Sequence, residues 1–134
     1  MASGIYNQFK ADILNKEIDW EADTIKVGLL DDNHSFTATD TDWSDVSANE
    51  VSGTGYTAGG ATLANAAVTE AATTKADADD STWSTASFTA AHAVIYDTSA
   101  SNNLIASIDF GGNQTVTTGT FTIQWDSDGI ITLT

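Results

Sequence analysis

FTAAHAVIYDTSASNNLIASIDFGG, residues 88–112, is the stretch that decides the fold of this chain. The apolar run AVIY is followed by SASNN, a segment of residues that favour turns. Beyond the turn, apolar side chains recur at every second position from Leu104 to Phe110. Two strand-like runs joined by turn residues predict an antiparallel β-hairpin.

The C-terminal stretch FTIQWDSDGIITL, residues 121–133, continues the β pattern. Phe121, Ile123 and Trp125 would share one face of a strand, with polar residues on the other face. We therefore expect a second hairpin, whose turn at 126–129 leads into a return strand at 130–133.

The middle of the chain alternates between strands and polar turns. Residues 24–30 alternate as a half-buried strand requires, whereas 31–52 are polar and predict a loop with one helical turn at 43–48. GTGYTAGG, residues 53–60, contains four glycines and predicts turns. Residues 61–70, rich in Ala and Thr, predict a weakly apolar strand.

The N-terminus predicts the one helix of the chain, at about residues 3–15. Ser3 can cap it, and apolar side chains follow at helical spacing. Short strands without interleaved helices favour a mainly β fold, an antiparallel β-sandwich of the Ig-like or jelly-roll-like kind. We expect a single domain, residues 1–134, that combines this sandwich with the helix.

Composition limits the classes of partner. The chain has 134 residues, 41% of them hydrophobic, and four tryptophans, so we expect it to fold as one domain. Nineteen acidic residues against four lysines, with no arginine, give a formal net charge of -15. Nucleic-acid binding needs a basic surface, so we expect no nucleic-acid partner. The same charge disfavours anionic membranes.

The sequence contains no cysteine, no proline and no stretch typical of a signal peptide or a membrane span, and each absence limits what we expect of the protein. Without cysteine the chain forms no disulfide and no thiolate site. The first residues lack the basic and apolar regions of a signal peptide, and no apolar run is long enough to span a bilayer, so we expect neither secretion nor insertion. Without proline, edge strands must be protected by charge, by a covering element or by a partner chain.

Two motifs suggest ligands, but their context argues against both. Gly53, Gly55 and Ala58 match a loose dinucleotide fingerprint, yet the flanking segment is polar and no helix is expected after it. Asp40, Asp42 and Asp45 begin like a calcium-binding loop, whose later ligand positions are missing. We expect no cofactor and no metal ligands, while a structural cation held by an acidic loop stays possible. Further acidic loops are at Asp77, Asp79 and Asp80, and at Asp126 and Asp128.

The chain offers no organised catalytic motif. His34 is expected in a loop and His92 in a strand, and neither belongs to a metal-binding or hydrolase motif. Some pair of carboxylates will lie close together by chance among nineteen, so such pairs carry little information. We expect a protein that is not an enzyme and has no catalytic residue.

Aromatic residues in acidic stretches suggest a protein interface, since interfaces are enriched in Trp and Tyr. Trp125 is expected to face inward, whereas three other tryptophans have polar and acidic neighbours. The glycine-rich turn could shape the same interface. The candidate interface residues are Trp20, Trp43, Trp83, Gly53, Gly55, Tyr56, Gly59 and Gly60.

Several phrases extend over nearly the whole chain in a fixed order: GIYNQFK, DTIKVGLL, DVSANEVSGTGYTAGG, HAVIYD, LIASIDFGG and FTIQWDSDGI. These phrases resemble a family of small virion structural proteins of tailed bacteriophages and prophages. DVSANEVSGTGYTAGG is the most specific of them. The resemblance implies a non-enzymatic component of the virion, assembled in the cytoplasm of the bacterial host.

The expected function is capsid decoration, in which a homo-oligomer stabilises the head through symmetric contacts with the major capsid protein or neighbouring virion proteins. Many small interfaces on a symmetric shell add up to a large stabilisation. Two alternatives stay open. The first is a neck, collar or tail component, and the second is a carbohydrate-binding module of the virion that uses exposed Trp.

Overall fold

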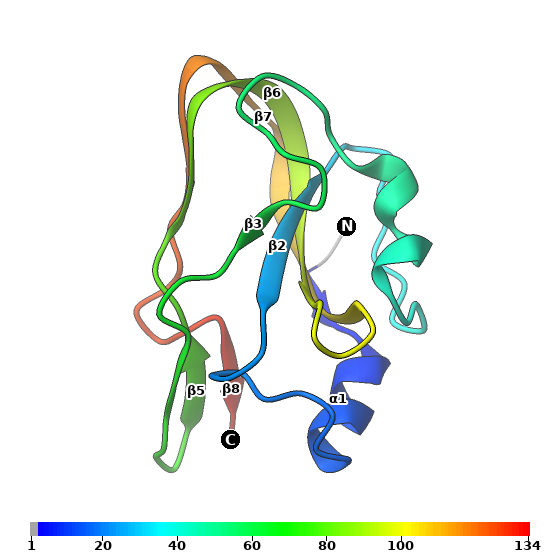
Figure 1. Cartoon of the computed structure of the whole chain (residues 1–134), viewed down its shortest axis with the longest axis vertical. Coiled ribbons are helices and arrows are strands. Elements are labelled where there is room, and N and C mark those ends of the chain that lie inside the picture. The colour runs from blue at the N-terminus through cyan, green and yellow to red at the C-terminus, as the bar shows by residue number, and fades with distance from the viewer. Residues whose placement is uncertain (1–2) are drawn as a thin grey trace.

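The computed structural model describes residues 3–134 and is mainly β, with two antiparallel sheets and one short helix near the N-terminus (Figure 1). The larger sheet has the strand order β1-β7-β6-β2-β3, and the smaller has the order β4-β5-β8. The predicted fold class is confirmed. The strands and the helix are β1 Gly4–Ile5, α1 Asn7–Leu14, β2 Ile25–Leu30, β3 Ala61–Thr62, β4 Ala67–Thr69, β5 Thr74–Asp77, β6 Ser81–Asp97, β7 Asn103–Ile123 and β8 Ile131–Leu133.

The longest strands, β6 and β7, form one hairpin that bends back on itself as an arch (Figure 1). The first hairpin predicted from the sequence is therefore confirmed, and its pairing extends from the turn to Ser81 and Ile123. The register shifts between Ala90 and His92. Opposite this shift, Gly111 and Gly112 have positive φ angles. Such irregularities bend a two-stranded ribbon, because the extra residue locally increases its twist.

The bend divides the hairpin into two limbs. The sheet limb, residues 92–97 and 103–109, lies within the larger sheet between β2 and β1. The outer limb is defined as residues 81–91 and 110–125, which comprise the remainder of the two strands and the two residues after β7. Its only other strand-like pairing in residues 3–134 is an isolated bridge from Ser87 to Thr54.

The second predicted hairpin is wrong. The expected turn does form, because the Gly129 N–H donates to the Asp126 carbonyl oxygen at 2.9 Å. The strand that follows it, β8, pairs with β5 in the smaller sheet and not with β7. Alternation in a sequence indicates which face a side chain occupies, but it does not select the neighbouring strand.

Two boundaries in the first half of the chain also differ from expectation. The helix α1 is shorter than the predicted range of 3–15, because β1 pairs with β7 before it and Tyr6 occupies the N-cap. Ser3 is not the cap, since its hydroxyl accepts from the Asp109 N–H. The predicted strand at 61–70 is instead two strands in different sheets, separated by Asn65 at φ 53°.

β2 is confirmed as a strand, but it is buried on both faces and not on one. Its Val27 and Leu29 belong to the main hydrophobic core, whereas Leu30 belongs to a second cluster on the opposite face of the sheet. The polar segment 31–52 covers this opposite face, and the one helical turn predicted at 43–48 forms as two short 3-10 turns, Trp43–Asp45 and Ser47–Asn49. A loop with few apolar residues can thus bury a sheet face, because Val46, Phe36 and Trp43 contact it.

Candidate interaction surface

The glycine-rich turn packs directly on strand backbone. A Cβ on Gly60 would overlap the carbonyl of Val27, and one on Gly55 would lie 2.8 Å from the Cα of Ala86. Gly55 and Gly60 also have φ angles of +80° and +85°, which favour glycine. Gly53 likewise lies against the backbone of Ser87. These glycines set the shape of the turn and hold it close to the larger sheet.

Hydrogen bonds anchor the same turn from inside. The Tyr56 hydroxyl accepts from the Leu29 N–H at 3.0 Å and donates to Glu50 at 2.8 Å. Glu50 also accepts from the Gly59 N–H at 2.5 Å, and the Tyr96 hydroxyl donates to the Gly59 carbonyl at 2.6 Å. Burial raises the pKa of Tyr56, and it raises the pKa of Tyr96 to about 12. Tyr56 is therefore tied to the body of the protein.

Two of the three tryptophans proposed for an interface are buried within the chain. Trp20 and Trp83 are 7% and 5% exposed, and the Trp20 indole donates to the Asp77 carbonyl at 2.9 Å. Trp43 is half-buried and stacks on Tyr96, with ring centroids 4.4 Å apart. The interface role of Trp20 and Trp83 loses its basis, because polar neighbours in sequence did not mean exposure of the rings.

The residues of the dinucleotide-like and calcium-like motifs form turns and a helix cap. The turn that contains Gly53 and Ala58 does not open a helix, since β3 follows it. The carboxylates of Asp42 and Asp45 accept backbone N–H groups as a capping box around Trp43–Asp45. Within residues 3–134, no group of three or more His, Cys, Asp or Glu side chains could hold a metal ion.

The two histidines are buried side by side, with ring centroids 5.0 Å apart. His34 lies in a loop and His92 in β6, as predicted. His34 Nε2 is 3.1 Å from Ser107 Oγ, but Ser107 is 1% exposed, so its hydroxyl is closed to a substrate. Burial, with a smaller contribution from the neighbouring His92, lowers the pKa of His34 to about 4. This pair therefore belongs to the interior of the fold.

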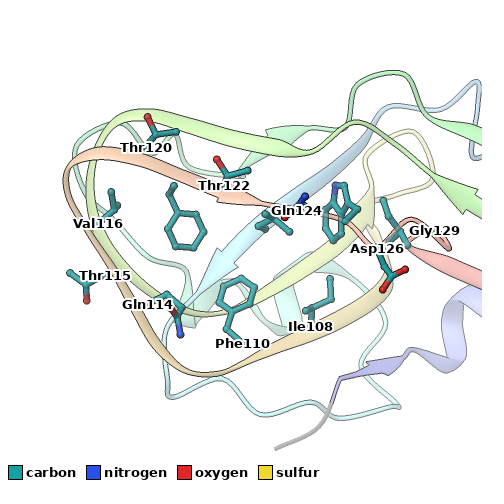
Figure 2. Close-up of a pocket in the computed structure, with 14 residues that line it drawn as sticks. Ile108, Phe110, Gln114, Thr115, Val116, Thr120, Thr122, Gln124, Asp126 and Gly129 are labelled. Carbon is teal, nitrogen blue, oxygen red and sulfur yellow. The ribbon is translucent and has the colours of Figure 1, made fainter.

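An open hollow of about 700 Å³ lies beside the outer limb. Figure 2 shows Ile108, Phe110 and Val116 on the inner side of the bent ribbon, where they line this hollow. Phe121 also lines it and contacts Phe88 and Phe110, at ring-centroid distances of 5.1 and 6.1 Å. These four apolar lining residues are half-buried and pack against the main core. The hollow is thus a side of the core that the chain leaves open.

Trp125, which the sequence placed on the inward face, also lines the hollow. It is half-buried, and its indole N–H donates to the Asp79 carbonyl at 3.1 Å. Polar side chains complete the lining, and all of them are exposed. The polar lining residues are Gln114, Thr115, Thr120, Thr122, Gln124 and Asp126.

The outer limb has no charged residue. Its two stretches, STWSTASFTAA and FGGNQTVTTGTFTIQW, lack Asp, Glu, Lys, Arg and His. At the chain average of 17% charged residues, about four or five would be expected in a segment of this length. All nineteen acidic residues therefore lie elsewhere, so that an uncharged limb projects from a strongly acidic body.

The β7 edge of the outer limb is also unpaired. β1 pairs with β7 only at Ala106 and Ser107. Beyond Ser107, no strand in the described part of the chain pairs with β7 on the side away from β6. An unpaired edge presents rows of N–H and C=O groups to which another strand can bond.

Sequence reasoning missed this surface. The uncharged run was visible in the sequence, but the bend, the hollow and the free edge depend on how the strands pair. No helix of the described residues is long and apolar enough to cross a membrane. No model of a known protein family matches the chain, and neither a curated protein nor a solved structure matches it.

Proposed function

We propose that this chain is a non-enzymatic structural protein of a bacteriophage virion. Its role is capsid decoration, in which several copies stabilise the head through symmetric contacts with one another and with the major capsid protein. The resemblance of its phrases to small phage structural proteins motivates the proposal. The observation that carries it is the separation between an acidic body and an uncharged limb beside an open hollow that aromatic and aliphatic side chains line in part.

This separation suits a protein that must stay soluble when free and pack densely when assembled. A net charge of -15 keeps free copies apart by mutual repulsion. Interface cores are depleted in charge and enriched in aromatic residues, as the outer limb is. On a shell with many equivalent positions, even a modest contact contributes to stability in every copy.

Reconstitution on purified shells tests the proposal. The protein is added to expanded empty heads that lack it, and resistance of the heads to heat and to chelators is measured with and without the addition. Decoration predicts saturable binding and a higher disruption temperature. Binding to tail tubes but not to heads would instead place the protein in the neck, collar or tail.

The copy number per particle gives an independent check. Quantitative mass spectrometry of purified virions would give hundreds of copies for a decoration protein. Neck or tail rings contain on the order of six to a few tens of copies, as their cyclic symmetry requires. Absence from the particle would contradict both placements.

A carbohydrate-binding module is the second candidate, favoured by the lining of the hollow. Phe110, Phe121 and Trp125 offer ring faces, while Gln114 and Gln124 offer hydrogen bonds, and this combination suits sugar hydroxyls. Host-surface glycans would then quench the fluorescence of Trp125. A Trp125→Phe variant should lose that response while the other tryptophans keep their emission, and a wild-type protein that responds to no glycan would exclude this candidate.

A further inference from the structure

We propose that the outer limb is the surface through which one copy of this chain binds a second copy. The inference rests on the proposed function in one respect, since decoration requires contacts between copies, and it names the residues that make them. The occupant of the hollow and of the free β7 edge is then the same limb of a neighbouring chain.

Charge selects this surface for contact between copies. Two molecules that each have a net charge of -15 repel one another, and most faces would bring carboxylates together. Like charges opposed across an interface cost several kcal/mol. Residues 81–91 and 110–125 contain no charge, and Asp126 is the one charged residue among the described residues that line the hollow, so copies that meet there bring few carboxylates together.

The local structure supplies what such a contact needs. From Phe110 onward, no strand of the described residues pairs with the β7 edge on the side away from β6, and the edge has neither the proline nor the lysine that usually protects an edge. Next to it, the hollow exposes part of Ile108, Phe110 and Val116. A neighbouring strand could bond to the edge while its side chains cover these apolar groups, as in strand addition.

The same observations disfavour other occupants. A basic protein or peptide would be attracted to the acidic body, where the nineteen carboxylates lie, and would gain nothing from the uncharged limb. A sugar could occupy the hollow but would not pair along the β7 edge. Only a protein strand can occupy the hollow and also pair along the β7 edge. A second copy supplies such a strand, and that strand is uncharged like the surface it meets.

Sedimentation velocity over a range of concentrations tests the inference, with two matched double variants. Gln114→Glu with Gln124→Glu places two charges on the outer limb at exposed positions. Asn7→Asp with Thr132→Glu places the same two charges at exposed positions on α1 and β8, away from the limb. Both variants have a net charge two units more negative than the wild type, and circular dichroism should show that both fold.

The wild type is expected to self-associate, and more strongly as salt rises from about 20 to 300 mM, because salt screens the repulsion between the bodies. The limb variant should raise the dissociation constant by at least about tenfold. The control variant should change it less than about threefold, since its added charges lie outside the contact.

Three results would overturn the inference. They are a wild type that stays monomeric at high concentration and high salt, two variants that weaken association equally, or a monomer whose hollow binds an oligosaccharide.

Hydrogen exchange gives a second readout, because the β7 edge amides should become protected as concentration rises. If the limb mediates association but the protein is absent from virions, the proposed function fails and this inference stands. If virions contain the protein and the limb variant assembles normally, this inference fails and the proposed function stands.

Discussion

The two limbs of the β6–β7 hairpin are made by the same two strands, yet their surroundings differ completely. The sheet limb is flanked by β2 and β1 and covered on both faces by the two hydrophobic clusters. In the described part of the chain, the outer limb has an unpaired β7 edge, a β6 edge with one isolated bridge, and a half-open inner face. The difference teaches that burial along the hairpin follows the neighbouring segments, because the same two strands are buried where β1, β2 and the two clusters flank them and are open where no segment covers them.

The largest expected difference is between glycine substitutions outside and inside the outer limb, measured as the loss in the free energy of unfolding. Gly60→Ala should lower the free energy of unfolding by about 3–4 kcal/mol, because the φ angle of +85° is strained for alanine and the new Cβ overlaps the Val27 carbonyl. Gly112→Ala, at φ +146° with nothing within 4 Å of the new Cβ, should cost about 1–2 kcal/mol. Urea denaturation measures both, and equal losses would show that backbone strain outweighs the overlap.

Removing the same methyl groups from each limb should sharpen the comparison. Val94→Ala, at a fully buried position of the sheet limb, should cost about 2–3 kcal/mol through lost burial and a cavity. Val116→Ala, half-buried beside the hollow, should cost less than about 1 kcal/mol. The two variants are compared by urea denaturation of dilute, monomeric protein. A costly Val116→Ala would mean that the hollow is already closed in the free protein.

Lowering the pH should destabilise the protein through groups in the sheet limb and in the loop that covers it, since the outer limb has no titratable side chain. The pKa of His34 is lowered to about 4 in the folded protein, mainly by burial, from 6.5 for an exposed histidine. The unfolded chain therefore binds the proton more readily, and stability is lost as pH falls from 6.5 towards 4. His34→Gln should lose about 2 kcal/mol less than the wild type over this window. Identical pH profiles from thermal unfolding would contradict this assignment.

Asp97 should act in the opposite direction. It is fully buried, and burial followed by its contact with Asp23 raises its pKa to about 7. Because the folded pKa exceeds the unfolded value of 3.8, Asp97 contributes stability at low pH that is lost as pH rises through about 7. Asp97→Asn should therefore raise stability by about 1 kcal/mol at pH 8, with little gain at pH 4. Thermal unfolding at the two pH values measures the difference, and a destabilised variant at pH 8 would show that the carboxylate charge is needed in the turn at Ser99 and Ala100.

Local patterns predicted local structure well. The turn after Asp97, the strand at β2 and the helical turns near Trp43 all formed where the residues indicated. These features depend on neighbours in sequence, so their signals are present in the chain itself. The candidate site was predicted less well, because Trp20, Trp83 and Tyr56 proved to be tied into the body.

The sequence patterns did not predict which strands pair with each other. β8 was expected beside β7 but pairs with β5, and 61–70 was divided between two sheets at Asn65. Both outcomes depend on contacts between residues far apart in the chain. Loop closure and packing select among several pairings that satisfy the same alternation.

By itself, the sequence determined the mainly β class, the central hairpin turn, the acidic character of the protein and the uncharged composition of residues 81–91 and 110–125. These are properties of residues or of close neighbours. Only the tertiary structure decided that the hairpin bends, that its sheet limb is buried on both faces, and that its outer limb keeps a free edge beside an open hollow. The physical reason is that exposure depends on which distant segments cover a strand, and no local pattern records that choice.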